Sequence, residues 1–126
     1  MKLHNLDNSP YSARVRELFA APAHAGDLKS GQSAQVEAQD LRLRLSAVTS
    51  DGAIATMRFR AWGCPHSIAA AEAACNALEG QPVAALLEFS AHDLMEYLSV
   101  PVEKTGRILV LEDAVRSLGL KFRDGP

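Results

Sequence analysis

The residues with the clearest capacity for chemistry lie in the stretch Trp62-Gly63-Cys64-Pro65-His66-Ser67-Ile68. A thiol at the start of a helix is stabilised as a thiolate by the helix dipole, which lowers its pKa and raises its reactivity. Such a thiolate can receive sulfur as a persulfide or bind a metal. The alternative is that Cys64 is a small apolar side chain packed beneath Trp62. Because Cys64 lies in a turn, we expect an accessible thiol.

Further metal ligands are scarce near this thiol. His66 can reach the same centre if the helix starts late, and the alternative for His66 is a solvated surface residue; the sequence leaves both open. Cys75 lies on the apolar face of its helix and is expected in the core. His4 and His92 have no such context, so we expect both at the surface.

The sequence gives little support for an enzymatic function. The chain contains no Gly-rich phosphate loop and no Gly-x-Ser-x-Gly motif. Cys64 and His66 are too close in sequence for the geometry of a nucleophile and its base to be assumed. We therefore expect the protein not to be an enzyme.

Two strands lead up to Cys64. Residues 41–47 alternate apolar and polar side chains, which indicates a strand with one buried face. The Asp-Gly pair at 51–52 predicts a tight hairpin, and residues 53–61 return as the partner strand. Residues 32–38 alternate weakly and are consistent with an edge strand.

The polar face of this sheet carries the four arginines Arg42, Arg44, Arg58 and Arg60. Four basic side chains on one face can bind an anion or an acidic partner. The reading we favour is a solvated face whose charge is partly offset by nearby acids.

Helical spacing predicts that the remaining segments are helices, at residues 10–20, at 65–79, from 82, from 90 and at 107–118. Ser9 is expected to cap the first of these helices, Gly119 to end the last, and residues 121–126 to form a frayed tail. The predicted fold class is α+β: a small antiparallel sheet of two to three strands with helices packed on one face.

Length and composition exclude several classes of protein. The 126 residues fit a single domain over 1–126, and a net charge of −2 gives no basis for binding nucleic acid or an anionic membrane. No run approaches the roughly 18 apolar residues of a membrane span, and the N-terminus lacks the apolar core of a secretory signal. Two cysteines form neither a disulfide framework nor a zinc-finger pair. A reducing, cytoplasmic location is the expectation.

Several motifs occur here in the same order as in a known family. The segment Phe59-Arg60-Ala61-Trp62-Gly63-Cys64, followed by Ser67-Ile68-Ala69, matches a Phe-x-x-x-Gly-Cys and Ala-Ile-Ala pattern. Tyr11, the loop Pro22-Ala23-His24-Ala25-Gly26, Asp40 and Glu112-Asp113-Ala114 match further positions. Over nearly its whole length the chain resembles the IscU/NifU N-terminal domain family of iron–sulfur cluster assembly scaffolds, whose fold is of the SufE/NifU type.

The sequence departs from the family at the ligand positions. The family holds its metal or cluster with three cysteines and an Asp, often with a His before the third cysteine. Ala38 stands at the first cysteine position, Arg107 at the third and Gly106 at the preceding His. Cys64 and Asp40 remain. The family's chaperone-recognition stretch, Leu-Pro-Pro-Val-Lys, is reduced to Val100-Pro101-Val102-Glu103-Lys104.

The resemblance implies a role in iron–sulfur cluster assembly, with cysteine desulfurase or an Hsp70-type chaperone system as partners. The ligands that the resemblance implies are Cys64 and Asp40, and His66, two residues beyond Cys64, is a further candidate metal ligand. His24 is a fourth candidate, for which a solvated surface position is the expectation. One thiolate and one carboxylate do not complete a four-ligand site, so iron, a cluster, zinc and no cofactor at all remain open. The alternative function is an adaptor or regulatory module that has lost the cluster.

Overall fold

A computed structural model describes residues 11–38 and 41–124. The elements in chain order are α2 (Ala13–Ala20), β1 (Gln32–Ala38), β2 (Leu41–Ser50), β3 (Ala53–Trp62), α3 (Pro65–Leu78), α4 (Ala85–Glu88), α5 (Ala91–Leu98), a 3-10 helix η1 (Val102–Lys104) and α6 (Thr105–Asp124). The strands form an antiparallel sheet in the order β1-β2-β3.

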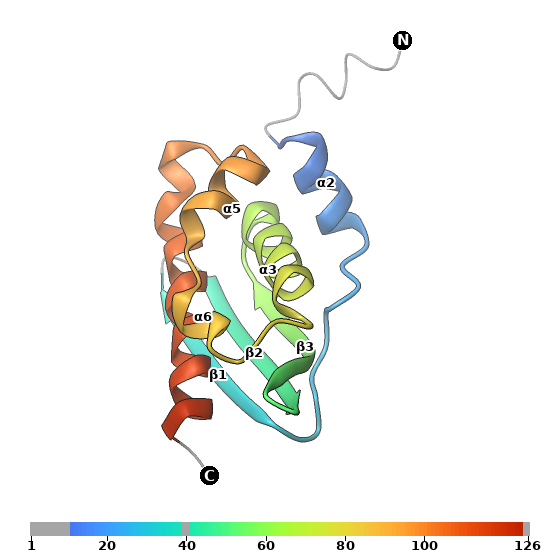
Figure 1. The fold of residues 1–126 in the computed structure, drawn as a ribbon. Coiled ribbons are helices and arrows are strands. Elements are labelled where there is room, and N and C mark those ends of the chain that lie inside the picture. Colours follow the sequence, from blue (N-terminus) through green and yellow to red (C-terminus); the bar gives the residue numbers. More distant parts are fainter. Residues whose placement is uncertain (1–10, 39–40, 125–126) are drawn as a thin grey trace.

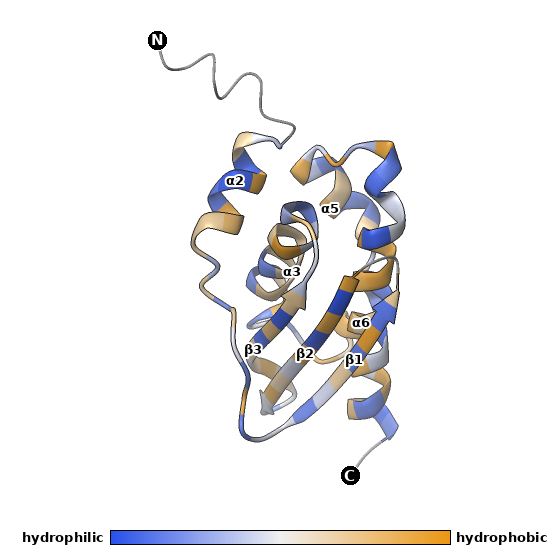
Figure 2. Cartoon of the chain, turned by 180° about the vertical axis from the view of Figure 1, so that it is seen from behind, coloured by the Kyte–Doolittle hydropathy of each residue, from blue (hydrophilic) through white to orange (hydrophobic). Residues whose placement is uncertain are grey.

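Apolar and polar side chains alternate along β2 and β3, which gives the sheet one buried face. Leu43, Leu45, Met57 and Phe59 are buried on one face, where α3 and α6 pack against the sheet (Figure 1). Asp51 and Gly52 both have positive φ, as the tight hairpin between β2 and β3 requires. Figure 2 shows the opposite face of the sheet, and none of the described helices lies over it.

The four arginines lie on this open face, as predicted. Arg44 lies opposite Arg60 in the register of β2 and β3, and Arg42 lies opposite Trp62. Each arginine has an acidic partner: Arg42 pairs with Glu37, Arg44 and Arg60 with Asp27, and Arg58 with Glu79. The expectation of a solvated face offset by acids is confirmed.

α3 is the central helix of the molecule. It contacts α2, β3, α5 and α6, and its alanines are buried on several sides of the helix. Small side chains let four neighbours approach one helix closely. Gly80, with positive φ, follows the end of α3 as expected for a helix stop.

Two predicted helix ends are wrong. The first helix begins at Ala13 with Ser12 as its N-cap, because the Ser12 side chain accepts a hydrogen bond from the Val15 N–H. Ser9, the predicted cap, lies outside the described residues. The last helix runs through Gly119 to Asp124. A Cβ on Gly119 would lie 2.9 Å from the Leu86 Cβ, so this glycine permits close packing of α4 and does not end the helix.

Candidate functional site

Cys64 is the N-cap residue of α3, directly after the end of β3. Its side chain is half-buried, and its Sγ lies 3.6 Å from the Ser67 Oγ. Burial raises the pKa of Cys64, but hydrogen bonds from the Ser67 side chain and from the backbone N–H groups of Ser67 and His66, together with the charge of Lys104, outweigh it. The pKa of Cys64 is therefore lowered, which favours the thiolate at the start of α3.

His66 is buried beside this thiol. Its side chain is only 1% exposed, and its ring centroid lies 4.8 Å from that of Tyr11. Neither ring nitrogen has a hydrogen-bond partner among the described residues. Burial lowers the pKa of His66, and so do the charges of Lys104 and Arg107, against the opposing charge of Glu103. His66 is therefore a neutral buried imidazole, and the hypothesis that His66 is a solvated surface residue is wrong.

The charges around Cys64 and His66 come from the segment that leads into α6. Lys104 ends η1, and Arg107 lies in the first turn of α6. These two positive side chains lie close enough to His66 to disfavour its charged form. At the position where the resemblance implies the third cysteine, the chain thus places a cation. Positive charge here stabilises a thiolate and repels a metal ion.

The described residues do not complete a metal site around Cys64. Among them, only His92, Asp93 and Glu96 form a group of three ligand side chains whose atoms lie within 4.8 Å of one another, and all three are exposed on α5. The surface position expected for His92 is confirmed. Ala38 ends β1 and offers no ligand atom. Asp40, the other implied ligand, lies outside the described residues, so the structure does not test its place beside Cys64.

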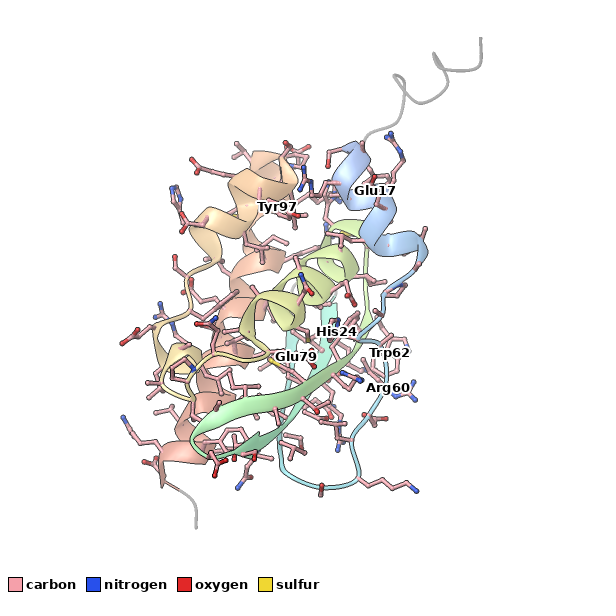
Figure 3. The ribbon with its side chains drawn as sticks, turned by 45° about the vertical axis from the view of Figure 1, so that its right-hand side comes forward. Glu17, His24, Arg60, Trp62, Glu79 and Tyr97 are labelled. Atoms are coloured by element: carbon pink, nitrogen blue, oxygen red, sulfur yellow. The ribbon has the colours of Figure 1, made fainter. Side chains whose placement is uncertain are left out.

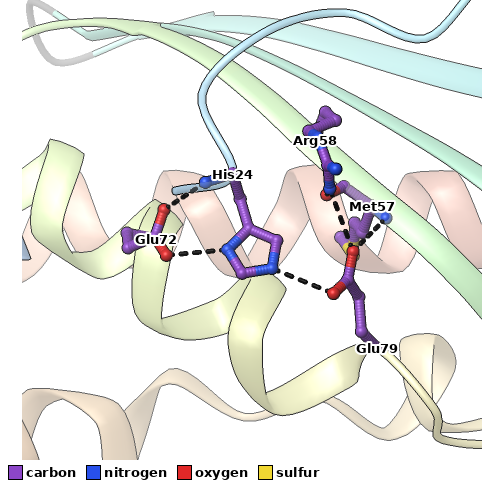
Figure 4. Close-up of polar contacts among 5 residues, drawn as sticks. All are labelled: His24, Met57, Arg58, Glu72 and Glu79. Carbon is purple, nitrogen blue, oxygen red and sulfur yellow. Dashed lines mark hydrogen bonds and ion pairs between the residues drawn. The ribbon is translucent and has the colours of Figure 1, made fainter. Parts of the chain in front are cut away.

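His24 lies at the opposite end of α3 from Cys64. It is 9% exposed, and its ring nitrogens contact Glu72 of α3 and Glu79, the C-cap residue of α3. Nδ1 lies 2.7 Å from Glu72 Oε2, and Nε2 lies 2.9 Å from Glu79 Oε1 (Figures 3 and 4). The expectation that His24 is a solvated surface residue is wrong. Both ring nitrogens are engaged by carboxylates, so neither has a lone pair available for a metal.

The His24–Glu72–Glu79 cluster was missed by sequence reasoning. Burial lowers the pKa of His24, but the hydrogen bonds and charges of Glu72 and Glu79 outweigh it, so the pKa of His24 is raised. The pKa of Glu79 is lowered, because the Met57 N–H, His24 and Arg58 outweigh its burial. The available signal was Glu72 itself, a lone acid within the alanine run at residues 69–74. An acid in a helix that is apolar on all sides needs a buried partner.

Trp62 stands on the surface next to Cys64. It is 52% exposed, and the Arg42 guanidinium lies 5.6 Å from its ring centroid. A hollow of about 580 Å³ lies on one side, lined by Glu37, Ala38, Leu41, Arg42 and Trp62. Another of about 280 Å³ is lined by Phe19, Pro22, Ala25, Gly26, Phe59, Arg60, Ala61, Trp62 and Ile68. Trp62 and Ala38, the latter at the implied first ligand position, thus line one hollow beside the Cys64 turn.

Comparison with known proteins identifies the family. The family model for the NifU-like N terminal domain matches residues 10–123. The chain belongs to this family. The NifU-like chain is also similar to a curated relative, the iron–sulfur cluster assembly protein IscU of Plasmodium falciparum (isolate 3D7), with 24% identity over 121 residues, covering 90% of this chain and 74% of the relative.

Solved structures confirm the predicted α+β, NifU-type fold of the NifU-like chain. The N-terminal NifU-like protein of Brucella abortus superposes with a TM-score of 0.72 at 15% identity, covering 91% of this chain and 95% of that one. The SUF-system protein FiSufU of Fervidobacterium islandicum AW-1 gives a TM-score of 0.58 at 15% identity, covering 90% and 86%. None of the described helices is long and apolar enough to cross a bilayer.

Proposed function

We propose that this NifU-like chain is a scaffold-like protein of iron–sulfur cluster assembly, with Cys64 as the residue that contacts the cargo. The observation that carries the proposal is the position of Cys64: a half-buried thiol with a lowered pKa, at the Gly-Cys turn between β3 and α3, in a chain that matches the family from residue 10 to 123. Soft thiolate sulfur is the ligand type that cluster iron prefers.

The cargo is proposed to be iron or an iron–sulfur cluster that Cys64 holds weakly or together with ligands from a second subunit. A single thiolate does not close a four-ligand site, and Lys104 next to Cys64 disfavours a cation there. Asp40 and His66 are the remaining proposed ligands within the chain. His66 is neutral and its ring nitrogens are unpartnered among the described residues, so it has a lone pair to offer.

Anaerobic reconstitution with ferrous iron and sulfide, followed by visible absorption, tests this proposal. The wild-type protein is expected to develop charge-transfer absorption that the Cys64→Ser variant lacks. Cys75→Ala is the matched control, because Cys75 is buried in the core and its variant should keep the absorption. A parallel titration with zinc distinguishes a zinc site from an iron site. Equal absorption in wild type and Cys64→Ser, or none in the wild type, contradicts cargo binding by Cys64.

The second candidate function is an adaptor that keeps the family's surfaces and has lost the cluster. It is favoured by Ala38 and Arg107 at ligand positions and by the charge of Lys104 beside Cys64. The proposed partners are a cysteine desulfurase or an Hsp70-type chaperone. For an adaptor, immobilised wild type and Cys64→Ser should retain purified desulfurase or chaperone equally well. Retention of neither partner contradicts this function.

A further inference from the structure

The segment between α2 and β1 includes a short strap, residues 22–27, that lies along the outer edge of β3. The Phe59 N–H donates to the His24 carbonyl at 2.9 Å, and the Gly26 N–H donates to the Phe59 carbonyl at 2.7 Å. The strap thus satisfies both backbone groups that Phe59 directs to the sheet edge. Its Pro22, Ala25 and Gly26 also line the smaller hollow beside Trp62.

His24 connects this strap to α3 and, through α3, to β3. Its backbone N–H donates to Glu72 Oε1 at 2.8 Å, while the ring contacts Glu72 Oε2 and Glu79 Oε1 (Figure 4). The second oxygen of Glu79 accepts from the Met57 N–H at 2.7 Å and from the Arg58 Nη1 at 3.1 Å. Both ring nitrogens can donate only when the imidazole carries two protons.

The charges of this cluster balance only while His24 is protonated. Glu72 of α3 and Glu79 at its C-cap supply two negative charges, and Arg58 of β3 and protonated His24 supply two positive ones. Asp27 of the strap is engaged elsewhere, by Arg44 and Arg60. Cys75 of α3 also lies near both glutamates, and its pKa is strongly raised, by burial first, so it stays a neutral thiol. When His24 loses a proton, the lone pair of one ring nitrogen faces a carboxylate, and the cluster carries an excess negative charge.

We propose that His24 is a pH-operated latch, which holds the strap against β3 while protonated and releases the strap when deprotonated. The strap's other attachments are the hydrogen bond from the His24 backbone N–H to Glu72, the two backbone hydrogen bonds to Phe59 and the ion pairs of Asp27. The ion pairs are exposed and contribute little individually. Release uncovers the edge of β3 at Phe59 and widens the hollow beside Trp62.

Native-state hydrogen exchange of the Gly26 and Phe59 amides, read by NMR as protection factors, tests the latch. Protection should be constant from about pH 5.5 to the ordinary histidine pKa of 6.5 and should fall above it. The total fall should equal the ratio of the proton-dissociation constants of His24 in the open and closed strap. A separate NMR titration of His24 measures the constant for the closed strap, and the ordinary histidine pKa of 6.5 gives the constant for the open strap. We expect the measured fall in amide protection to agree with the value obtained from the His24 titration.

Two variants and one internal reference separate the latch from general loosening. In His24→Gln, protection at Gly26 and Phe59 should be low and independent of pH, whereas Asp27→Asn should lower protection and keep the pH dependence. If His24→Gln does not fold, Glu79→Gln serves in its place. The fall should then be smaller and end at lower pH, because the neutral amide holds the proton on His24 less strongly. The core amide of Leu45 is the reference. An equal fall at Leu45, or none at Gly26 and Phe59, overturns the proposal.

Discussion

The two ends of α3 each hold a buried histidine, and the pKa values of the two histidines are shifted in opposite directions. At the N-terminal end, His66 lies beside Cys64 without a hydrogen-bond partner among the described residues, and its pKa is lowered. In the C-terminal half, His24 contacts Glu72 and Glu79, and its pKa is raised. Burial alone removes the charge of a histidine, whereas burial between carboxylates retains it.

This difference divides α3 into an end suited to chemistry and an end suited to structure. A thiolate with a lowered pKa and a neutral imidazole can each offer an electron pair to a metal or to sulfur. The His24 imidazole, with a raised pKa and both nitrogens engaged by carboxylates, is instead suited to joining three segments of the fold.

Removal of one carboxylate at the structural end should have the largest effect. Glu72→Ala leaves the His24 ring and backbone N–H without their acceptor in a buried position. The free energy of unfolding should fall by about 3 kcal/mol, the cost of breaking a buried charged pair. Urea denaturation measures it, with the exposed Asp113→Ala as control, for which a change within about 0.5 kcal/mol is expected. A loss below about 1 kcal/mol for Glu72→Ala would show that His24 is not held as described.

The same apolar substitution should have opposite effects on the two histidines. His24→Leu removes hydrogen bonds to two carboxylates and should destabilise the protein by about 2 kcal/mol. His66→Leu removes two unpartnered buried nitrogens and should be neutral or stabilising by about 1 kcal/mol. Denaturation midpoints of the two variants give the comparison directly. Destabilisation by both to a similar degree would remove the distinction between the two ends.

The pH dependence of stability should have two limbs, one for each histidine. The pKa of His24 is raised, so its contribution is complete below the ordinary value of 6.5 and is lost as pH rises through its folded pKa. The pKa of His66 is lowered, so its contribution is present above 6.5 and is lost as pH falls through its folded pKa. Urea titrations across this range should show that His24→Gln lacks the alkaline limb and His66→Leu the acid limb. Unchanged limbs would mean that other groups govern the profile.

The two cysteines should differ in reactivity. Substitution of the reactive one should change the stability of the protein only slightly. Cys64 is half-buried with a lowered pKa, whereas burial strongly raises the pKa of Cys75. Iodoacetamide should therefore modify Cys64 in the folded protein and Cys75 only after unfolding, as peptide mass mapping would show. Cys64→Ser should change the free energy of unfolding by less than about 1 kcal/mol. A larger loss would identify Cys64 as a packing residue.

The elements that rest on local pattern were predictable from the sequence. Alternation identified β2 and β3, the Asp-Gly pair identified their hairpin, and the change to helical spacing identified the start of α3 and the turn that holds Cys64. These features depend on residues within a few positions of one another. The α+β fold class followed from them.

The charge states of the histidines were not predictable, because their causes are distant in sequence. His24 contacts Glu72 and Glu79, which lie 48 and 55 positions away. His66 lies against Tyr11 and near Arg107, which tertiary packing brings together. Gly119 has the residue type of a helix cap, and only the approach of Leu86 shows its role. Asp40 lies outside the described residues, and its role as a ligand stays a prediction.

A single NMR titration of protein labelled at histidine side chains and cysteine Cβ tests the division of α3 most directly. We expect His24 to titrate above pH 6.5 and His66 below it. Cys64 should ionise below the ordinary thiol pKa of 9.0, and Cys75 should not ionise in the folded protein. The reverse order of the two histidines, or ionisation of Cys64 above 9.0, would contradict this division of α3.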